Sequence, residues 1–263
     1  MIMPLRMIRV ECMEYITSAK NPLIARIRRL GSERKARRGE GLFLCEGPKM
    51  LTEALRWETV VDTVVCAEGV VLPNLPQSVR VVQVPEGLLR AVALTEAPQG
   101  LVFLCKGKPL SLPEKLEGDR WLVLDGLQDP GNVGTVWRTA DAFGASGLLL
   151  CNSCDPWNPK VVRATMGAIF RLPVYEGGME EIAALVKEAG LPLYATALRD
   201  DTVDVADLDL KRCAAIIGSE GRGVSEQALE LCQATVKIPM RDRCESLNAA
   251  VAAAVVLWEG WRN

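Results

Sequence analysis

One stretch of the sequence, residues 121–151, constrains the fold more than any other. Residues 121–124 are an apolar run that predicts a strand, and residues 125–131 are a loop rich in Gly, Asp and Pro. Residues 132–143 place apolar side chains at the spacing of one helix face, and residues 148–151 predict a second strand. Two strands joined through a helix form a βαβ unit. Such a unit favours a parallel sheet that is covered by helices.

The same alternation of strands and helices continues on both sides of this unit. Towards the C-terminus, we expect strands at residues 193–197, 214–218 and 235–238 and helices at residues 179–189, 225–232 and 246–261. Towards the N-terminus, we expect strands at residues 42–45, 59–66, 79–84 and 101–105 and helices near residues 48–57 and 86–94. Aromatic residues are only 5% of the chain, which also favours α/β layers over an aromatic-rich β-sandwich.

A polar segment separates the two blocks. Residues 107–118 are punctuated by Pro and Gly, which is typical of an interdomain linker. We therefore predict a smaller N-terminal α/β domain at residues 1–106, a linker at residues 107–118 and a C-terminal α/β domain at residues 119–263. The 263-residue length is sufficient for two such domains.

A basic arm precedes the first sheet. Asn21 and Pro22 mark the start of a helix, and Gly39 and Gly41 end the arm. Residues 1–40 carry a charge of +6, from 10 Lys or Arg and 4 Asp or Glu, whereas the rest of the chain carries −8, from 21 and 29. A basic arm on an acidic body predicts a polyanionic partner for the arm, and a solvated basic helix is the equally weighted alternative.

The chain contains no histidine, which excludes several kinds of catalysis. A Ser-His-Asp triad, a Cys-His pair and an HExxH zinc site all require imidazole. Acid–base chemistry must therefore use carboxylates, Lys, Tyr, Cys, an activated water molecule or the substrate itself.

The cysteines and the apolar runs indicate a cytoplasmic protein without a membrane segment. Charged residues interrupt the first 16 residues, so no signal-peptide core is present, and the longest apolar run, residues 249–258, is too short to span a bilayer. The nine cysteines are therefore expected to be reduced. Cys151 and Cys154 form a CxxC pair that could suit redox chemistry or half a zinc site. Because there is neither a second CxxC nor a histidine, we favour structural cysteines and expect no metal.

Three polar loops of the second block each follow a predicted strand. They are residues 125–134, 217–225 and 238–248. In open α/β sheets, ligands bind beyond the carboxyl ends of the strands. Neither glycine loop has the GxGxxG context of a dinucleotide site, and no Gly-Lys-Ser/Thr sequence of a P-loop occurs. Glycine loops expose main-chain groups, which suits a small polar ligand with an adenine or amino-acid moiety.

Five stretches of the chain resemble one protein family. Residues 129–144, 217–225 and 238–254 are similar, in order and spacing, to the three motifs of the SpoU (TrmH-type) RNA 2′-O-ribose methyltransferases of the SPOUT superfamily. Residues 16–24 and 41–47 resemble the RNA-binding N-terminal domain of that family. The resemblance covers residues 16–261, and three long motifs in order are far more specific than a single glycine loop.

The resemblance implies a fold and an activity. The C-terminal domain would be a SPOUT methyltransferase domain with a deep trefoil knot, and the protein would be a homodimer joined through this domain. Its cofactor would be S-adenosylmethionine, and it would transfer a methyl group to a ribose 2′-hydroxyl. The two-part layout is closer to the enzymes that modify ribosomal RNA than to the shorter transfer-RNA enzymes, although this argument is one of analogy.

The family motifs also imply roles for individual residues. The expected catalytic residues are Asn132, Arg138, Glu220, Ser246 and Asn248. The expected cofactor-binding residues are Thr196, Ala197, Gly218, Ile238, Met240, Ser246 and Leu247. The expected RNA-binding residues are Arg26, Arg28, Arg29, Arg34, Lys35, Arg37 and Arg38 in the basic arm, with Lys160 and Arg163 in the second block. Asp242 departs from the glycine usual in the family.

Several of these residues also have ordinary structural explanations. A guanidinium is a poor base, so our hypothesis is that Arg138 holds an RNA phosphate and polarises the hydroxyl, while phosphate or water takes the proton. The alternative for Arg138 is a surface ion pair with Asp141. Glu220 could orient Asn132 or Arg138. Alternatively, its negative charge could interact only with solvent or with the dipole of the helix that starts near Ser225. Ser246 and Asn248 could be helix caps.

Three other functions remain open from the sequence alone. The chain could be a non-catalytic RNA-binding protein that retains the fold, and binding of S-adenosylmethionine would discriminate against this possibility. It could methylate transfer RNA instead of ribosomal RNA. A nucleotide- or dinucleotide-dependent enzyme would bind ATP or NAD instead.

Overall fold

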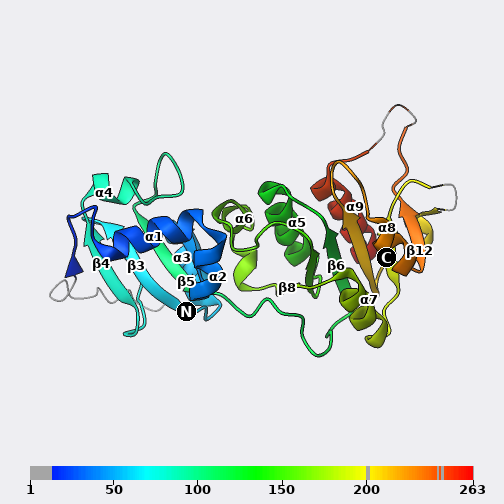
Figure 1. Ribbon diagram of the computed structural model, residues 1–263, viewed down its shortest axis with the longest axis horizontal. Coiled ribbons are helices and arrows are strands. Elements are labelled where there is room, and N and C mark those ends of the chain that lie inside the picture. Colours follow the sequence, from blue (N-terminus) through cyan, green and yellow to red (C-terminus); the bar gives the residue numbers. More distant parts are fainter. Residues whose placement is uncertain (1–13, 200–201, 242, 244–245, 263) are drawn as a thin grey trace. The chain divides into compact units, whose positions relative to one another are not determined.

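The structure is a computed structural model that describes residues 14–199, 202–241, 243 and 246–262. The chain forms two compact units (Figure 1). The first contains Met1–Lys108 together with Trp157–Phe170, and the second contains Pro109–Pro156 and Arg171–Asn263. Both units contain strands and helices, as the α/β class predicted from the sequence requires.

The first unit is built on a mixed five-stranded sheet in the order β1-β4-β3-β5-β2. Its strands are β1 (Glu14–Tyr15), β2 (Leu42–Glu46), β3 (Val61–Ala67), β4 (Arg80–Val84) and β5 (Leu101–Lys106). Strand β5 runs antiparallel to β2 and β3, whereas β4 runs parallel to β1 and β3. The sequence predicted four of these strands and missed β1, which has only two residues.

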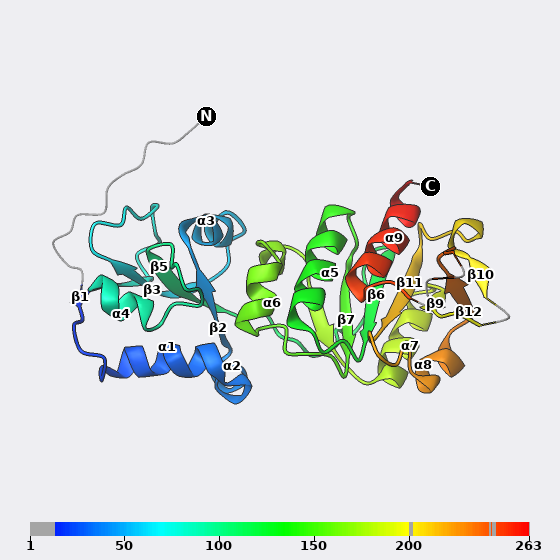
Figure 2. The same cartoon turned by 90° about the horizontal axis from the view of Figure 1, so that it is seen from above.

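Helices cover both faces of this sheet (Figure 2). They are α1 (Pro22–Ser32), α2 (Arg34–Glu40), α3 (Pro48–Arg56), α4 (Glu86–Arg90) and α6 (Pro159–Ala164), with a short 3-10 helix at Ala168–Phe170. Helix α1 begins where the Asn21 side chain accepts a hydrogen bond from the Leu23 amide at 2.8 Å. Helix α2 ends at Gly41, which adopts a left-handed φ of 63°.

The segment 157–170 follows β7 in the second unit but packs within the first. The Trp157 ring stacks on Phe43 of β2 with a centroid distance of 6.2 Å, and Phe170 stacks on Phe43 at 6.4 Å. Arg38 covers Trp157 at 5.2 Å from the ring centroid. Burial of these aromatic rings explains why this segment, which the sequence analysis includes in the C-terminal domain, lies against β2.

The second unit contains a seven-stranded sheet in the order β10-β12-β9-β11-β6-β7-β8. Its strands are β6 (Arg120–Asp125), β7 (Gly147–Cys151), β8 (Val174–Glu176), β9 (Leu193–Thr196), β10 (Val203–Asp204), β11 (Cys213–Gly218) and β12 (Ala234–Lys237). Every pair of neighbouring strands is parallel. The expected parallel sheet is confirmed, and the trefoil knot stays a prediction from the family resemblance.

Four helices form the outer layers of this unit. Helices α7 (Met179–Glu188) and α8 (Glu226–Leu231) cover one face, and α5 (Pro130–Ala142) and α9 (Ala249–Arg262) pack together on the other (Figure 2). A 3-10 helix at Val205–Asp207 contacts α9. Alternate residues of the central strands face each layer, so the sheet is apolar on both sides, as a buried parallel sheet requires.

The predicted linker is part of the second unit from Pro109 onward. The Leu110 carbonyl accepts a hydrogen bond from the Glu176 amide at 2.6 Å, and Ser111 forms a parallel bridge with Glu176. Leu116 is buried in the core of the unit. The main-chain contacts of Leu110 and Ser111 therefore hold this stretch along the edge strand β8, and Leu116 anchors it in the core.

Candidate active site

The three polar loops of the second unit meet at the carboxyl ends of β6, β11 and β12. Strands β6 and β11 are neighbours, and their last residues, Asp125 and Gly218, lie opposite each other. A Cβ atom on Gly218 would come within 2.2 Å of the Gly223 carbonyl carbon and the Val224 nitrogen. Only glycine therefore allows the loop after β11 to fold back so closely on its strand.

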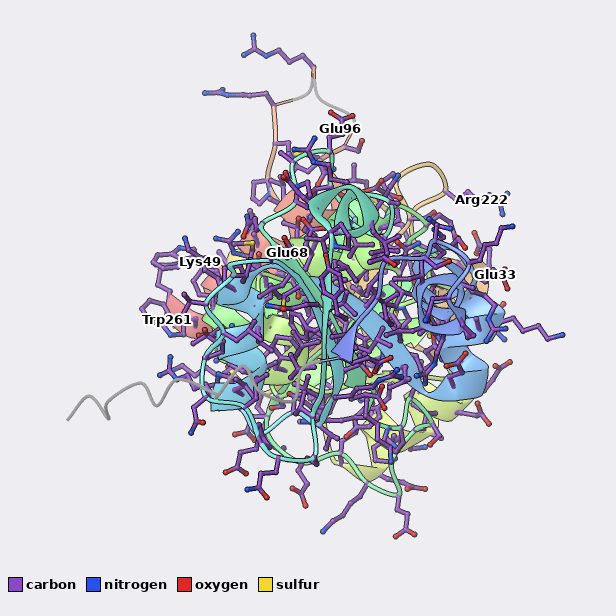
Figure 3. The ribbon with its side chains drawn as sticks, turned by 90° about the vertical axis from the view of Figure 1, so that its left-hand side faces the viewer. Glu33, Lys49, Glu68, Glu96, Arg222 and Trp261 are labelled. Carbon is purple, nitrogen blue, oxygen red and sulfur yellow. The ribbon has the colours of Figure 1, made fainter. Side chains whose placement is uncertain are left out.

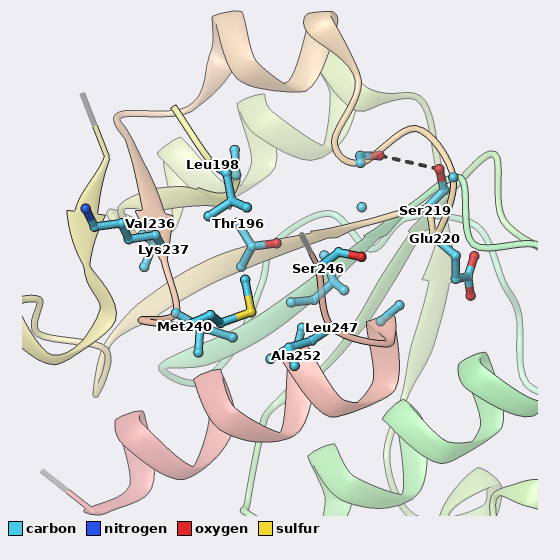
Figure 4. A pocket seen from close by; sticks show the side chains of 17 residues that line it. Thr196, Leu198, Ser219, Glu220, Val236, Lys237, Met240, Ser246, Leu247 and Ala252 are labelled. Carbon is cyan, nitrogen blue, oxygen red and sulfur yellow. Dashed lines mark hydrogen bonds between the residues drawn. The ribbon is translucent and has the colours of Figure 1, made fainter. Parts of the chain in front are cut away.

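A cavity of about 440 Å³ lies between the segments that follow β9, β11 and β12 (Figure 4). The structure places all seven expected cofactor-binding residues in its lining: Thr196, Ala197, Gly218, Ile238, Met240, Ser246 and Leu247. Other lining residues were not predicted, including Leu198, Val236 and Lys237. Their positions in the sequence could have indicated them, because they adjoin the expected cofactor-binding residues at the ends of β9 and β12.

The walls of this cavity suit a ligand that is partly apolar and partly polar. Apolar side chains from Ile217, Val236 and Leu247 alternate with glycine main chain in the lining. The Thr196 hydroxyl donates to the Ile216 carbonyl at 2.9 Å and so holds β9 against β11 beneath the cavity. Mostly apolar walls with a few polar groups are typical of cofactor sites, and such a lining fits S-adenosylmethionine.

A chain of hydrogen bonds joins one residue from each of the three motifs. The Asn132 side-chain amide donates from Nδ2 to Glu220 Oε1 at 2.5 Å. Asn248 Nδ2 donates to Asn132 Oδ1 at 3.1 Å. Glu220 lies at one end of the cavity and Ser246 in its lining (Figure 4). The alternative was that Glu220 interacts only with the N-terminus of a helix. It is wrong, because the Glu220 carboxylate accepts a hydrogen bond from Asn132.

Both asparagines are positioned by helix starts. Asp129 caps α5 by accepting a hydrogen bond from the Asn132 amide at 2.7 Å, so Asn132 lies in the first turn. The Asn248 Oδ1 accepts from the amides of Ala250 at 2.9 Å and Val251 at 3.3 Å. Asn248 thus caps α9 with its oxygen while its nitrogen reaches Asn132, so capping and a site role coexist. This cap explains why α9 starts at Ala249, three residues later than predicted.

Arg138 is exposed on α5, six residues after Asn132. Among the described residues it makes no hydrogen bond or ion pair, and the structure does not join it to the Glu220–Asn132–Asn248 chain. The expected alternative partner, Asp141, accepts instead from Arg171 Nη2 at 2.7 Å and Nε at 2.9 Å. The surface ion pair between Arg138 and Asp141 is therefore wrong, and the Arg138 guanidinium is available to a ligand.

The residues expected to bind RNA have several different environments. Arg26 and Arg29 each contact the Glu40 carboxylate at 2.6 Å, and Arg37 is buried with its Nη1 donating to the Leu30 carbonyl at 2.8 Å. Arg38 is half-buried against Trp157. The remaining five expected residues are exposed: Arg28, Arg34, Lys35, Lys160 and Arg163. Lys160 and Arg163 lie on α6, so they belong to the same unit as the basic arm.

The cysteine pair does not have the features of a redox or metal site. Cys151 is a buried thiol. Burial, with the negative charges of Asp125 and Glu180, raises the pKa of the Cys151 thiol, which disfavours the reactive thiolate. In the part of the chain that the structure describes, no cluster of three or more His, Cys, Asp or Glu could hold a metal ion. The same part contains no helix long and apolar enough to cross a membrane.

Comparison with known protein families shows which family this chain matches. Residues 119–258 match the model of the SpoU rRNA Methylase family. The chain belongs to the SpoU rRNA methylase family. Residues 21–102 match a second model, the MRM3-like substrate binding domain. The family predicted from the three motifs is therefore confirmed.

Individual members of the SpoU family resemble the chain over nearly its whole length. The 23S rRNA (guanosine(2553)-2′-O)-methyltransferase RlmP of Bacillus subtilis is 31% identical, over 94% of this chain and 98% of its own. The crystal structure of an AdoMet-bound rRNA methyltransferase from Sinorhizobium meliloti superposes with a TM-score of 0.84 at 30% identity, over 95% of this chain and 98% of that one. In contrast, the TrmH/SpoU tRNA modifying enzyme of A. aeolicus covers 57% of this chain, with a TM-score of 0.51 and 25% identity.

Proposed function

We propose that this protein transfers a methyl group from S-adenosylmethionine to a ribose 2′-hydroxyl of ribosomal RNA. The observation that carries the proposal is the Glu220–Asn132–Asn248 chain beside a cavity of about 440 Å³. Relatives that match nearly the whole chain and are named rRNA methyltransferases support ribosomal RNA as the substrate, whereas the tRNA modifying enzyme covers 57% of this chain.

The residues that line the cavity would hold the cofactor. When bound, S-adenosylmethionine supplies a methyl group on a sulfonium sulfur, which leaves as a neutral thioether. The protein must then align the ribose hydroxyl with that methyl group and exclude water, and positioning accounts for most of the acceleration in such reactions. No strong protein base is needed for the leaving group.

Asn132 and Glu220 would fix the ribose end of the site. Because the Asn132 amide donates to Glu220 and accepts from Asn248, its orientation is set by both partners. The Glu220 carboxylate is then held in one position, where it can accept a hydrogen bond from a ribose hydroxyl. We assign Arg138 to a phosphate of the RNA, where its charge polarises the hydroxyl, and the phosphate or water takes the proton.

Mass spectrometry of RNA would test this function. Ribosomal RNA from cells with and without the protein should differ by one or more 2′-O-methyl groups, and an Asn132→Ala protein should not restore them. Calorimetry of the purified protein with S-adenosylmethionine should show binding, whereas a non-catalytic relative should show none. Binding of NAD or ATP in its place, or unchanged ribosomal RNA, would contradict the proposal.

We further propose that the protein is a homodimer through the second unit. The outer side of α9 exposes Val251, Trp258 and Trp261, which are 49%, 45% and 56% accessible. Trp258 and Trp261 stack at 5.3 Å, and Phe143 at the end of α5 contacts both rings. Exposed apolar clusters of this kind mark protein interfaces. We also propose a cytoplasmic location, which a ribosomal RNA substrate supports.

A further inference from the structure

A second cavity lies beside the cofactor cavity, at the carboxyl ends of β6, β7 and β11. Its volume is about 630 Å³, and it is lined by polar residues that include Asp125, Gln128 and Asn152. Strand β6 is the first strand of its sheet, β7 follows it on one side, and β11 lies on its other side. The cavity is thus at the topological switch point of the sheet, where ligands of open α/β folds commonly bind.

The two cavities share a wall. Glu220 and Gly221 line both, as do Ser219 and Gly223. Asn132 holds the Glu220 carboxylate in this wall. A nucleoside whose ribose hydroxyl lies at Glu220 therefore has the cofactor cavity on one side and the second cavity on the other.

The second cavity presents hydrogen-bond acceptors that the protein leaves unused. The Asp125 side chain is 5% exposed, and its Oδ2 accepts from the Ser225 amide at 2.8 Å. Its other oxygen has no hydrogen bond among the described residues. Gln128 Nε2 donates to the carbonyls of Asn152 at 2.6 Å and Gly126 at 3.3 Å, which leaves Oε1 as an acceptor. A buried carboxylate with a free oxygen requires a donor from a ligand or from water.

We infer that the second cavity receives the base of the nucleotide whose ribose is methylated, and that it favours guanine. This inference rests on the proposed function. Guanine presents the N1–H and N2–H donors side by side on its Watson–Crick edge, one for the free oxygen of Asp125 and one for Gln128 Oε1. Adenine and cytosine place a ring-nitrogen acceptor beside their amino group, and that lone pair would face a carboxylate oxygen. Proteins read unstacked RNA bases on these edges.

Arg222 would complete the site at its rim. Its side chain is exposed and projects from the glycine loop that forms the shared wall (Figure 3). A guanidinium plane can stack on the open face of a splayed-out base or contact its phosphate. The loop would thus contact the base through Arg222 and the ribose through Glu220.

The test uses the full-length protein and a large-subunit ribosomal RNA transcript. Mass spectrometry first identifies the methylated position, and transcripts are then made with G, A, C, U or inosine at that position. Inosine lacks only the N2 amino group of guanosine. We expect wild-type protein to prefer G, with kcat/KM about 100-fold lower for inosine, because a site built for hydrogen bonds rejects an analogue that lacks a donor.

The variant Asp125→Asn converts the free acceptor into a donor while the other amide atom can still accept from Ser225. We expect kcat/KM for G to fall about 100-fold and that for A to rise, with the Kd for S-adenosylmethionine unchanged. The matched control is Asp119→Asn, which makes the same chemical change just before the start of β6, where Asp119 contacts Arg212 at the surface. The control should keep the wild-type base preference.

Several outcomes would overturn the inference while the proposed function stands. They are a methylated nucleotide other than guanosine, equal rates on G and inosine, or an Asp125→Asn protein with the wild-type base preference. The comparison of G with inosine uses only wild-type protein. It therefore tests the preference for guanine even if the Asp125→Asn protein does not fold. Wild-type protein that methylates no ribosomal RNA would instead overturn the proposed function, and this inference with it.

Discussion

Asn132 is the residue through which the three motifs are connected. It donates to Glu220 and accepts from Asn248, so its amide is satisfied by one residue on each side. We expect Asn132→Asp to lower kcat about 100-fold, because a carboxylate would then face Glu220 in place of a donor. Binding of S-adenosylmethionine should change little, since Asn132 does not line its cavity. Single-turnover kinetics and calorimetry would separate these two effects.

The same variant makes a prediction about pH. Two carboxylates in contact raise the pKa of one of them, so Asn132→Asp should regain part of its activity as the pH is lowered from 8 to about 5. Asn132→Ala has no second carboxylate and serves as the control, since its rate should not rise at low pH. Parallel pH profiles for the two variants would contradict the proposed contact.

A second residue, Glu40, links the basic arm to the stability of the first unit. Burial acts to raise the Glu40 pKa, but hydrogen bonds from Arg26 and Arg29 outweigh it and the pKa is lowered. A lowered pKa contributes stability above the unfolded value of about 4.3, and this stability is lost as the pH falls through the folded value. Glu40→Gln should therefore cost about 1 kcal/mol near pH 7 and progressively less below pH 4. Chemical denaturation at several pH values would measure the difference.

The structure brings several of the expected site residues together, but the sequence did not indicate all of their hydrogen-bond partners. Residues such as Glu220 and Ser246 were found because each lies in a motif, and strands that end at one edge of a sheet bring their loops together. The alternative considered for Arg138 was an ion pair with Asp141, three residues away, but Asp141 contacts Arg171 instead. Local spacing indicates only that two helical residues are close, whereas Arg171 reaches Asp141 through tertiary packing that no spacing records.

Among the elements, the segment 157–170 has the clearest effect on packing. The Trp157 ring lies so close to Gly107 that a Cβ atom there would be 2.1 Å from its Cζ2 atom. We expect Gly107→Ala to destabilise the first unit by about 1–3 kcal/mol, the usual effect of overpacking. Gly39→Ala is the control, because a Cβ atom at Gly39 meets nothing within 4 Å. It should leave stability unchanged or raise it by up to about 1 kcal/mol, as Ala does in a helix. Thermal unfolding of the wild type and of both variants would measure these changes in stability.

The aromatic cluster on α9 tests the proposed dimer. Trp261 projects outward from α9 (Figure 3) and stacks on Trp258, so a charge there would be desolvated in an interface. Trp261→Lys should convert the dimer to monomer in light scattering, with no loss of helix content. Trp57→Lys is the control, since Trp57 is a similarly exposed tryptophan in the first unit, at 46% accessible. A monomeric wild-type protein would contradict the proposal.

Across the whole molecule, the long periodic elements were predictable and the short ones were not. Strand β6 and helix α5 follow from their own apolar pattern. Strand β8 has three residues and β10 has two, so their pairing depends on neighbours in the sheet and not on a local pattern. The placement of residues 157–170 with the first unit also lay beyond sequence reasoning, because only the packed structure shows that Trp157 finds its partner in Phe43.

The charges of the whole molecule predict how RNA binding responds to salt. Each phosphate contact contributes about 0.7–0.9 to the slope of log K against log salt. Lys160 and Arg163 are exposed on α6, so replacing both by alanine should lower the slope by about 1.5 and weaken binding to all RNA sequences. Arg26→Ala should change the slope much less, because Arg26 is already paired with Glu40. Filter binding of a ribosomal RNA transcript at several salt concentrations would measure all three proteins. A slope that does not differ between wild type and the double variant would exclude Lys160 and Arg163 from the RNA interface.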